Sequence, residues 1–148
     1  MSTFKMKSKE PISEIRSIFK AYDYIAAAYI FGSQIRGTDN RMSDLDIAIL
    51  LKENEPSNLV LLDEKLLLEY RIQSHFKVNQ VDLVELNRQG LVFQHNVIKI
   101  GKLIYDGDAL FRKKFETKVI LDYCDFKPTL RLIEKYHLQG RLRRCGIK

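Results

Sequence analysis

Asp44 and Asp46 open an apolar run of the chain, and their type and spacing fit metal chemistry. In a strand, residues two apart point to the same face, so the two carboxylates would lie side by side at one end of a sheet. Like charges so close repel unless a cation lies between them. Hard divalent cations such as Mg²⁺ prefer a few carboxylate oxygens together with the oxygens of a bound phosphate. The pair therefore predicts a metal site that works on a phosphate compound.

Gly32 and Ser33 come directly after a second apolar run, residues 25–31, that reads as a buried strand. A glycine lets the backbone approach a phosphate closely, and free backbone N–H groups with the Ser33 hydroxyl would bind its oxygens. An ordinary strand-to-helix turn with a serine cap would look the same. The aspartates behind it favour the phosphate site. Arg36 would either neutralise phosphate charge or brace the loop by pairing with an aspartate, and both roles stay open.

Three short motifs together resemble the signature of the minimal nucleotidyltransferases, within the polymerase-β-type nucleotidyltransferase superfamily. They are Gly32-Ser33, Arg36-Gly37 and Ser43-Asp44-Leu45-Asp46-Ile47. Ten residues separate Ser33 from Asp44, which fits the family pattern. One position departs from it, because Ile35 stands where many members have alanine. We expect the larger side chain to be tolerated there.

Asp82 lies in Val81–Leu86, an alternating segment that predicts a third strand. It matches the third acidic residue of the family pattern, on a strand neighbouring the Asp44–Asp46 strand. The resemblance implies that Asp82 helps to hold a catalytic metal and to take the proton from an attacking hydroxyl. The alternative is a charge on the open face of an edge strand. Glu85 falls off the alternation and is not chosen.

The order of elements and the segment from Tyr123 to Pro128 resemble the MntA-type antitoxin branch of this family. Such a resemblance implies an enzyme that uses two Mg²⁺ ions and ATP to transfer AMP onto a tyrosine of a HEPN ribonuclease toxin. Asp44 and Asp46 would bind both ions, and Asp82 the catalytic ion only. Gly32 and Ser33 would hold the β- and γ-phosphates, with Arg36 as a helper. A complex with the toxin is the expected assembly.

The fold class expected is α/β, a small mixed sheet flanked by helices. Strands are expected at residues 25–31, 45–51, 81–86 and 102–105, and helices at 11–20, 58–76, 91–100, 109–123 and 128–138. The helix at 58–76 is apolar on more than one side. We favour its burial between two elements, and the alternative is an exposed strip that binds a partner. His95 is expected to be a structural residue.

Charge divides the chain into two parts. Residues 1–108 hold 14 Lys/Arg and 15 Asp/Glu, a net charge of −1, and residues 109–148 hold 11 and 4, a net charge of +7. We expect a single domain, with a nucleotidyltransferase core at 1–108. Residues 109–148 would be a basic helical segment packed on the core or on a partner. This segment is either a surface for an acidic partner or nucleic acid, or a solvated helix face.

The chain of 148 residues is long enough for one core, and no apolar run approaches the roughly 20 residues that span a bilayer. The polar N-terminus lacks a secretory pattern. Cys124 and Cys145 lie far apart, as free thiols of a cytoplasmic protein would. Membrane attachment is therefore not expected.

Three other functions are less well supported by the sequence. A non-catalytic module that neutralises its partner by occlusion has no need of three aspartates together. An enzyme with a small-molecule acceptor usually carries a larger second domain than the 40 residues after Asp108 provide. Direct nucleic-acid binding depends on the tail charge alone and is the least favoured.

Overall fold

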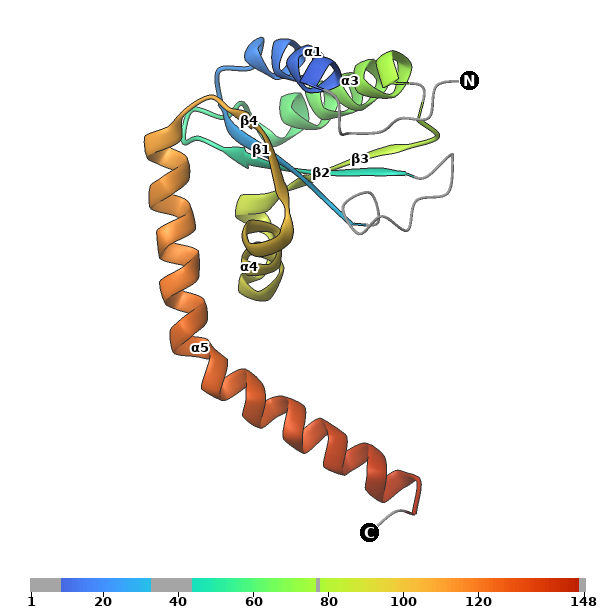
Figure 1. The fold of residues 1–148 in the computed structure, drawn as a ribbon, viewed down its shortest axis with the longest axis vertical. Helices are drawn as coiled ribbons and strands as arrows, with labels where there is room; N and C mark the ends of the chain where they lie inside the picture. The colour runs from blue at the N-terminus through green and yellow to red at the C-terminus, as the bar shows by residue number, and fades with distance from the viewer. Residues whose placement is uncertain (1–8, 33–43, 77, 147–148) are drawn as a thin grey trace.

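The structure, a computed structural model, describes residues 9–32, 44–76 and 78–146; of residues 9–12 it describes the backbone alone (Figure 1). The elements are α1 (Lys9–Lys20), β1 (Ile25–Phe31), β2 (Leu45–Leu51), α3 (Asn58–Phe76), β3 (Val81–Glu85), the 3-10 turn η1 (Leu86–Arg88), α4 (Leu91–Ile100), β4 (Lys102–Asp106) and α5 (Ala109–Arg144). The α/β class and the mixed sheet flanked by helices are confirmed.

Four strands form one sheet in the order β3-β2-β1-β4. β1 pairs antiparallel with β2 and β4, whereas β2 and β3 run parallel, with the long helix α3 as their crossover. The two central strands, IAAAYIF and LDIAILL, are almost wholly buried because helices cover both faces of the sheet. The parallel pair also carries two of the predicted site residues, Asp46 and Asp82.

Alternation along β2 divides the core between two faces of the sheet. Ile47 and Ile49 face the cluster that contains Ile15 and Phe19 of α1 together with the buried side of α3. Ala48 and Leu50 face the opposite cluster, to which α4 and the first half of α5 contribute. Figure 1 shows α1 and α3 above the sheet and α4 below it. The even-numbered residues of β2, such as Ala48, therefore face α4.

Side chains satisfy backbone groups at the end and edge of the parallel pair. Glu69 on α3 pairs with a backbone group of the edge strand β3, because its carboxylate accepts a hydrogen bond of 3.0 Å from the Leu83 N–H. The side-chain amide of Asn87 makes the two backbone hydrogen bonds that a neighbouring strand would make. It accepts from the Leu51 N–H at 2.7 Å and donates to the Leu51 carbonyl at 2.9 Å. These bonds fix the register of β2 against β3, because a backbone group left unpaired would be costly.

Only one side of α3 is buried, so the favoured interpretation of this helix, burial between two elements, is wrong. Leu61, Leu68 and Ile72 face the sheet. The other side presents a strip of large apolar residues to solvent. These are Leu59, Val60, Leu62, Leu66, Leu67 and Tyr70, each between 46% and 80% exposed. The sequence pattern alone could not decide this, because a helix that is apolar all round does not reveal which side meets the core.

α5 is one helix of 36 residues, not the two separate helices predicted. Asp108 caps it by accepting from the Phe111 N–H at 3.0 Å. Its first half is fixed to β1 where Tyr29 donates a hydrogen bond of 2.6 Å to Glu116. Pro128 lies inside the helix, and Figure 1 shows α5 changing direction about halfway along its length. Proline removes one backbone hydrogen bond and bends the helix here without ending it.

In the described ranges, no helix has the length and apolar character needed to cross a membrane.

The two sides of α3 allow a matched test of the core. Leu68 is 1% exposed and its neighbour Leu67 is 47% exposed. We expect Leu68→Ala to lower the free energy of unfolding by about 2–5 kcal/mol, because it leaves a cavity in the core. We expect Leu67→Ala to change it by about 0.5 kcal/mol or less. Urea unfolding of both variants measures this, and equal losses would contradict the assignment of the buried side.

Candidate functional site

Asp46 and Asp82 lie next to each other on neighbouring strands. The parallel pairing of β2 and β3 places these two residues directly in register. Both belong to the sheet face that carries α4, because Asp46 shares its parity with Ala48 and Leu50. Asp44 lies directly ahead of β2, two residues before Asp46, and its charge is close enough to contribute to the raised pKa of Asp46. The fold therefore brings the three predicted carboxylates to one edge of the sheet.

Asp46 is the innermost of the three carboxylates. It is half-buried, whereas Asp44 and Asp82 are exposed. Burial raises the pKa of Asp46 above its ordinary value, and the charges of Asp82 and then Asp44 raise it further. Each cause disfavours the ionised carboxylate. The site is an anionic cluster that favours a cation or a proton.

Gly32 closes the site from the end of β1, where Phe31 is in register with Asp46. Its φ of 88° lies in the region that favours glycine. A Cβ atom at this position would lie 2.6 Å from Oδ2 of Asp46. The sequence suggested that Gly32 makes room for a phosphate. The structure adds that any other residue here would have to adopt a strained φ and would displace the Asp46 carboxylate.

An aromatic pair, which no sequence pattern indicates, supports this end of β1. The rings of Phe31 and Phe93 meet edge to face with centroids 5.3 Å apart. Phe93 comes from α4, more than sixty residues away in the chain. The contact fixes the end of β1, and thus Gly32, against the helix below the carboxylates. A contact between segments so distant leaves no signal in a single sequence.

Two predicted site residues, Ser33 and Arg36, lie outside the described residues, as does Ile35. Their roles toward a nucleotide therefore remain predictions.

The three carboxylates provide the kind of oxygen donors that Mg²⁺ prefers. Burial, and then the charges of Asp82 and Asp44, raise the pKa of Asp46, and a bound cation would relieve the repulsion among the three carboxylates. In the part of the chain that the structure describes, no three His, Cys, Asp or Glu side chains are grouped closely enough to hold a metal ion by themselves. The residues therefore fit a metal whose remaining ligands come from a nucleotide, and they do not form a closed protein cage.

His95 and Glu85, neither of which was predicted to belong to the site, both have structural partners. The His95 ring stacks on Tyr123 of α5 with centroids 3.6 Å apart. Its pKa is lowered by burial and by the nearby charges of Lys99 and Lys127. Glu85 forms an ion pair with Lys65 at 3.1 Å, on the α3 side of the sheet. Neither residue joins the carboxylate cluster.

Comparison with known proteins gives consistent results. The family model described as Polymerase beta, Nucleotidyltransferase matches residues 13–110. A curated relative from Aphanizomenon flos-aquae (strain 2012/KM1/D3), named Protein adenylyltransferase MntA, is 30% identical over 155 residues, which is 96% of this chain and 100% of the relative.

Solved structures share the fold. One is described as a toxin-antitoxin with AMP-PNP, at 24% identity and TM-score 0.67, covering 86% of this chain and 98% of that chain. Another is described as the tri-AMPylated Shewanella oneidensis HEPN toxin in complex with MNT antitoxin. It has 21% identity and TM-score 0.64, and covers 88% of this chain and 98% of that chain.

The crowding of Asp46 predicts a pH-dependent effect on stability. An acid whose pKa is raised by folding favours the folded state at low pH, and this contribution is lost as the pH rises through the raised pKa. We therefore expect Asp46→Asn to be more stable than the wild type at pH 7 without metal, and the difference to shrink toward pH 4. Urea unfolding at both pH values measures it.

Asp63→Asn is the control, since Asp63 is an exposed carboxylate on α3, away from the cluster. A loss of stability in Asp46→Asn that is equal at the two pH values would contradict the electrostatic account.

Proposed function

Since the chain belongs to the polymerase β nucleotidyltransferase family, we propose that it is a protein adenylyltransferase that acts as an antitoxin. It transfers AMP from ATP onto a tyrosine of a HEPN ribonuclease toxin and so inactivates the toxin. The observation that carries the proposal is the alignment of Asp46 on β2 with Asp82 on β3, with Asp44 just ahead of Asp46. These carboxylates lie beside the end of β1, where Phe31 pairs with Asp46 and Gly32 follows. The relative named Protein adenylyltransferase MntA supports protein as the acceptor.

The carboxylates have distinct roles in this proposal. Asp44 and Asp46 hold two Mg²⁺ ions, and Asp82 holds the catalytic ion only. When bound, two such ions neutralise the triphosphate and stabilise the attacking and leaving oxygens. The half-buried position of Asp46 between two other carboxylates supports its place at the centre of the ligand set.

The reaction is an in-line displacement at the α-phosphorus of ATP. The tyrosine oxygen of the acceptor forms a bond to the α-phosphorus, and the bond from this phosphorus to the bridging oxygen of the β-phosphate breaks. Pyrophosphate leaves with that electron pair, and Asp82 helps to take the proton of the tyrosine hydroxyl. Gly32 and Ser33 hold the β- and γ-phosphates, and Arg36 assists by neutralising charge.

The C-terminal part of the chain favours a protein acceptor over a small molecule. Over Ala109–Arg144 the chain forms the single helix α5, whose second half exposes large apolar residues such as Leu132 and Tyr136, as a surface that meets another protein does. Occlusion of the toxin without transfer is disfavoured because it gives no reason to crowd three carboxylates at the expense of stability. The cytoplasm is the proposed compartment, and both cysteines are free and exposed in the structure.

The intact mass of a HEPN-type toxin, incubated with this protein, ATP and Mg²⁺, tests the proposal. We expect a gain of one or more AMP units on the toxin, mapped to a tyrosine by peptide mass spectrometry. The double variant Asp44→Asn, Asp46→Asn should fold and leave the toxin mass unchanged, because the metal ligands are gone. Asp63→Asn should transfer AMP at the wild-type rate.

Full transfer by the double variant would reject the site assignment. Tight binding of the toxin by the wild type without any gain in mass would instead favour neutralisation by occlusion.

A further inference from the structure

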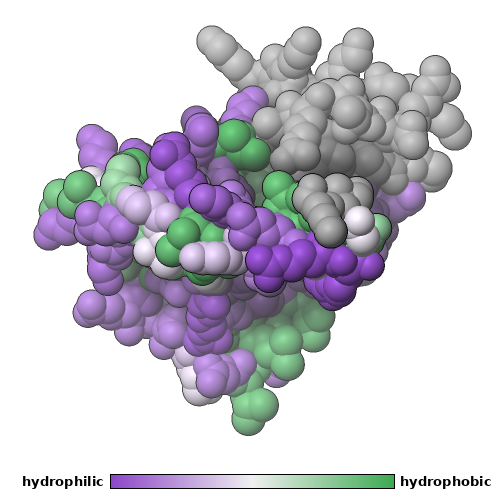
Figure 2. Space-filling view, turned by 90° about the horizontal axis from the view of Figure 1, so that it is seen from below, coloured by the Kyte–Doolittle hydropathy of each residue, from purple (hydrophilic) through white to green (hydrophobic). Residues whose placement is uncertain are grey.

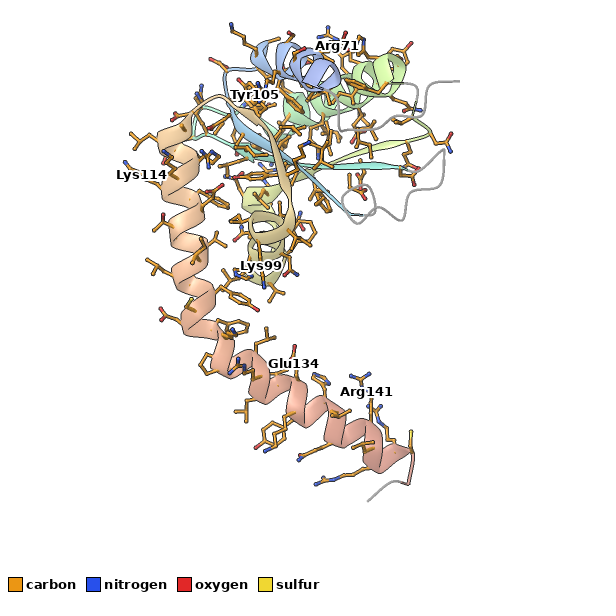
Figure 3. All side chains as sticks on the ribbon, in the orientation of Figure 1. Arg71, Lys99, Tyr105, Lys114, Glu134 and Arg141 are labelled. Atoms are coloured by element: carbon orange, nitrogen blue, oxygen red, sulfur yellow. The ribbon has the colours of Figure 1, made fainter. Side chains whose placement is uncertain are left out.

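The second half of α5 projects away from the core. We call residues 124–144 the distal arm. Val119 is the last buried residue of α5, and the Tyr123 ring on His95 is its last aromatic contact with α4 among the described residues. Figure 3 shows Glu134 and Arg141 on the arm, well clear of the sheet and of α4. At 1.5 Å per residue the arm is about 30 Å long, which is the span of a small domain.

In residues 126–136 of the distal arm, apolar and basic residues occupy different sides of the helix, whereas from Leu138 to Arg144 they are mixed. Phe126, Leu130, Ile133 and Tyr136 recur at helical spacing and fall on one side. The basic residues Lys127, Arg131 and Lys135 recur every four residues on the other side. Ile133 is 42% and Tyr136 64% exposed. Figure 2 shows the face of the molecule seen from below, where apolar residues, in green, reach a largely hydrophilic surface, in purple. An exposed amphipathic helix of this kind is typical of a protein interface.

The charge of the arm indicates the nature of its partner. The arm holds six Lys/Arg and two Asp/Glu. A second copy of this chain would bring one basic arm against another, which like-charge repulsion disfavours. Nucleic acid would neutralise the charge but would leave the side with Ile133 and Tyr136 uncovered. A protein with an apolar groove and acidic residues on its rim satisfies both sides of the helix.

The position of the arm relative to the carboxylates separates it from the other exposed apolar surface. Asp46 and Asp82 belong to the sheet face that carries α4, and the first half of α5 packs into the cluster on this same face. The strip on α3, which includes Leu59 and Leu62, lies on the opposite face. A protein bound by α3 would be separated from the carboxylates by the sheet.

We propose that the distal arm is the docking helix for the protein acceptor, with an apolar side that enters a groove of that protein and a basic side that meets its acidic rim. This inference rests on the proposed function, because it assigns the surface that brings the acceptor to the carboxylates. Docking contributes to binding of the acceptor and not to the chemical step. It therefore determines the KM for the acceptor and leaves kcat unchanged.

The test is the rate of AMP transfer to a HEPN-type toxin as a function of toxin concentration, with calorimetry for the Kd of the complex. The apolar variant is Ile133→Asp with Tyr136→Asp, and the charge variant is Arg131→Glu with Lys135→Glu. We expect each to raise KM and Kd by about tenfold or more at unchanged kcat, as loss of central interface contacts does. The charge variant should also reduce the salt dependence of binding.

The matched control is Leu59→Asp with Leu62→Asp on α3, which should keep the wild-type KM and Kd. Because the arm lies outside the core, its variants should keep the wild-type melting temperature. Should Ile133→Asp with Tyr136→Asp change the melting temperature, the variant Ile133→Ala with Tyr136→Ala replaces it, with the same expected rise in KM and Kd.

The outcomes separate this inference from the proposed function. Arm variants with wild-type KM and Kd, or a loss confined to the α3 control, would overturn the docking role. A loss of affinity for a 20-nucleotide single-stranded RNA, with KM for the toxin unchanged, would overturn it in favour of a nucleic-acid surface. Should the wild type bind the toxin without transferring AMP, the proposed function fails, and a loss of binding in the arm variants would still establish the docking surface.

Discussion

The parallel pairing of β2 with β3 is the constraint on which the site depends. It sets Asp46 against Asp82 on one face of the sheet, and the short spacing from Asp44 adds a third carboxylate. A shift of the register by one residue would move Asp82 to the opposite face and would bury a charge against α1 and α3. The hydrogen bonds of Glu69 and Asn87 to the backbone of the parallel pair protect that register.

Crowded carboxylates are a liability for folding and an advantage for function. Burial and two neighbouring charges raise the pKa of Asp46, so the ionised cluster weakens the folded state. The surrounding core compensates, with the central strands packed between helices on both faces. Gly32 and the Phe31–Phe93 contact position the end of β1 against the cluster without filling it. Local repulsion held in place by a rigid sheet is typical of sites that bind a cation.

Two helices with exposed apolar residues, α3 and α5, pack on opposite faces of the sheet and therefore differ in their position relative to the aspartates. Both α3 and α5 expose large apolar residues. Only α5 packs on the face of the aspartates, and it alone carries a strong excess of positive charge beyond the core. Exposure by itself would not distinguish the two surfaces. Their positions relative to the carboxylates, together with charge, make α5 the helix that can present a macromolecular acceptor to the site.

The sequence by itself predicted which residues could do chemistry, and it determined most of the elements. Asp44 and Asp46 are two residues apart, so local geometry suffices to place them together, and apolar runs and helical spacing are enough to give the bounds of β1, β2, α3 and α4. Tertiary structure decided what depends on contacts between distant segments. These are the alignment of Asp82 with Asp46, the positive φ and the close approach to Asp46 that favour glycine at 32, and the side of α3 that meets the core. It also decided that α5 continues through Pro128, because a proline whose neighbours remain helical bends a helix without ending it.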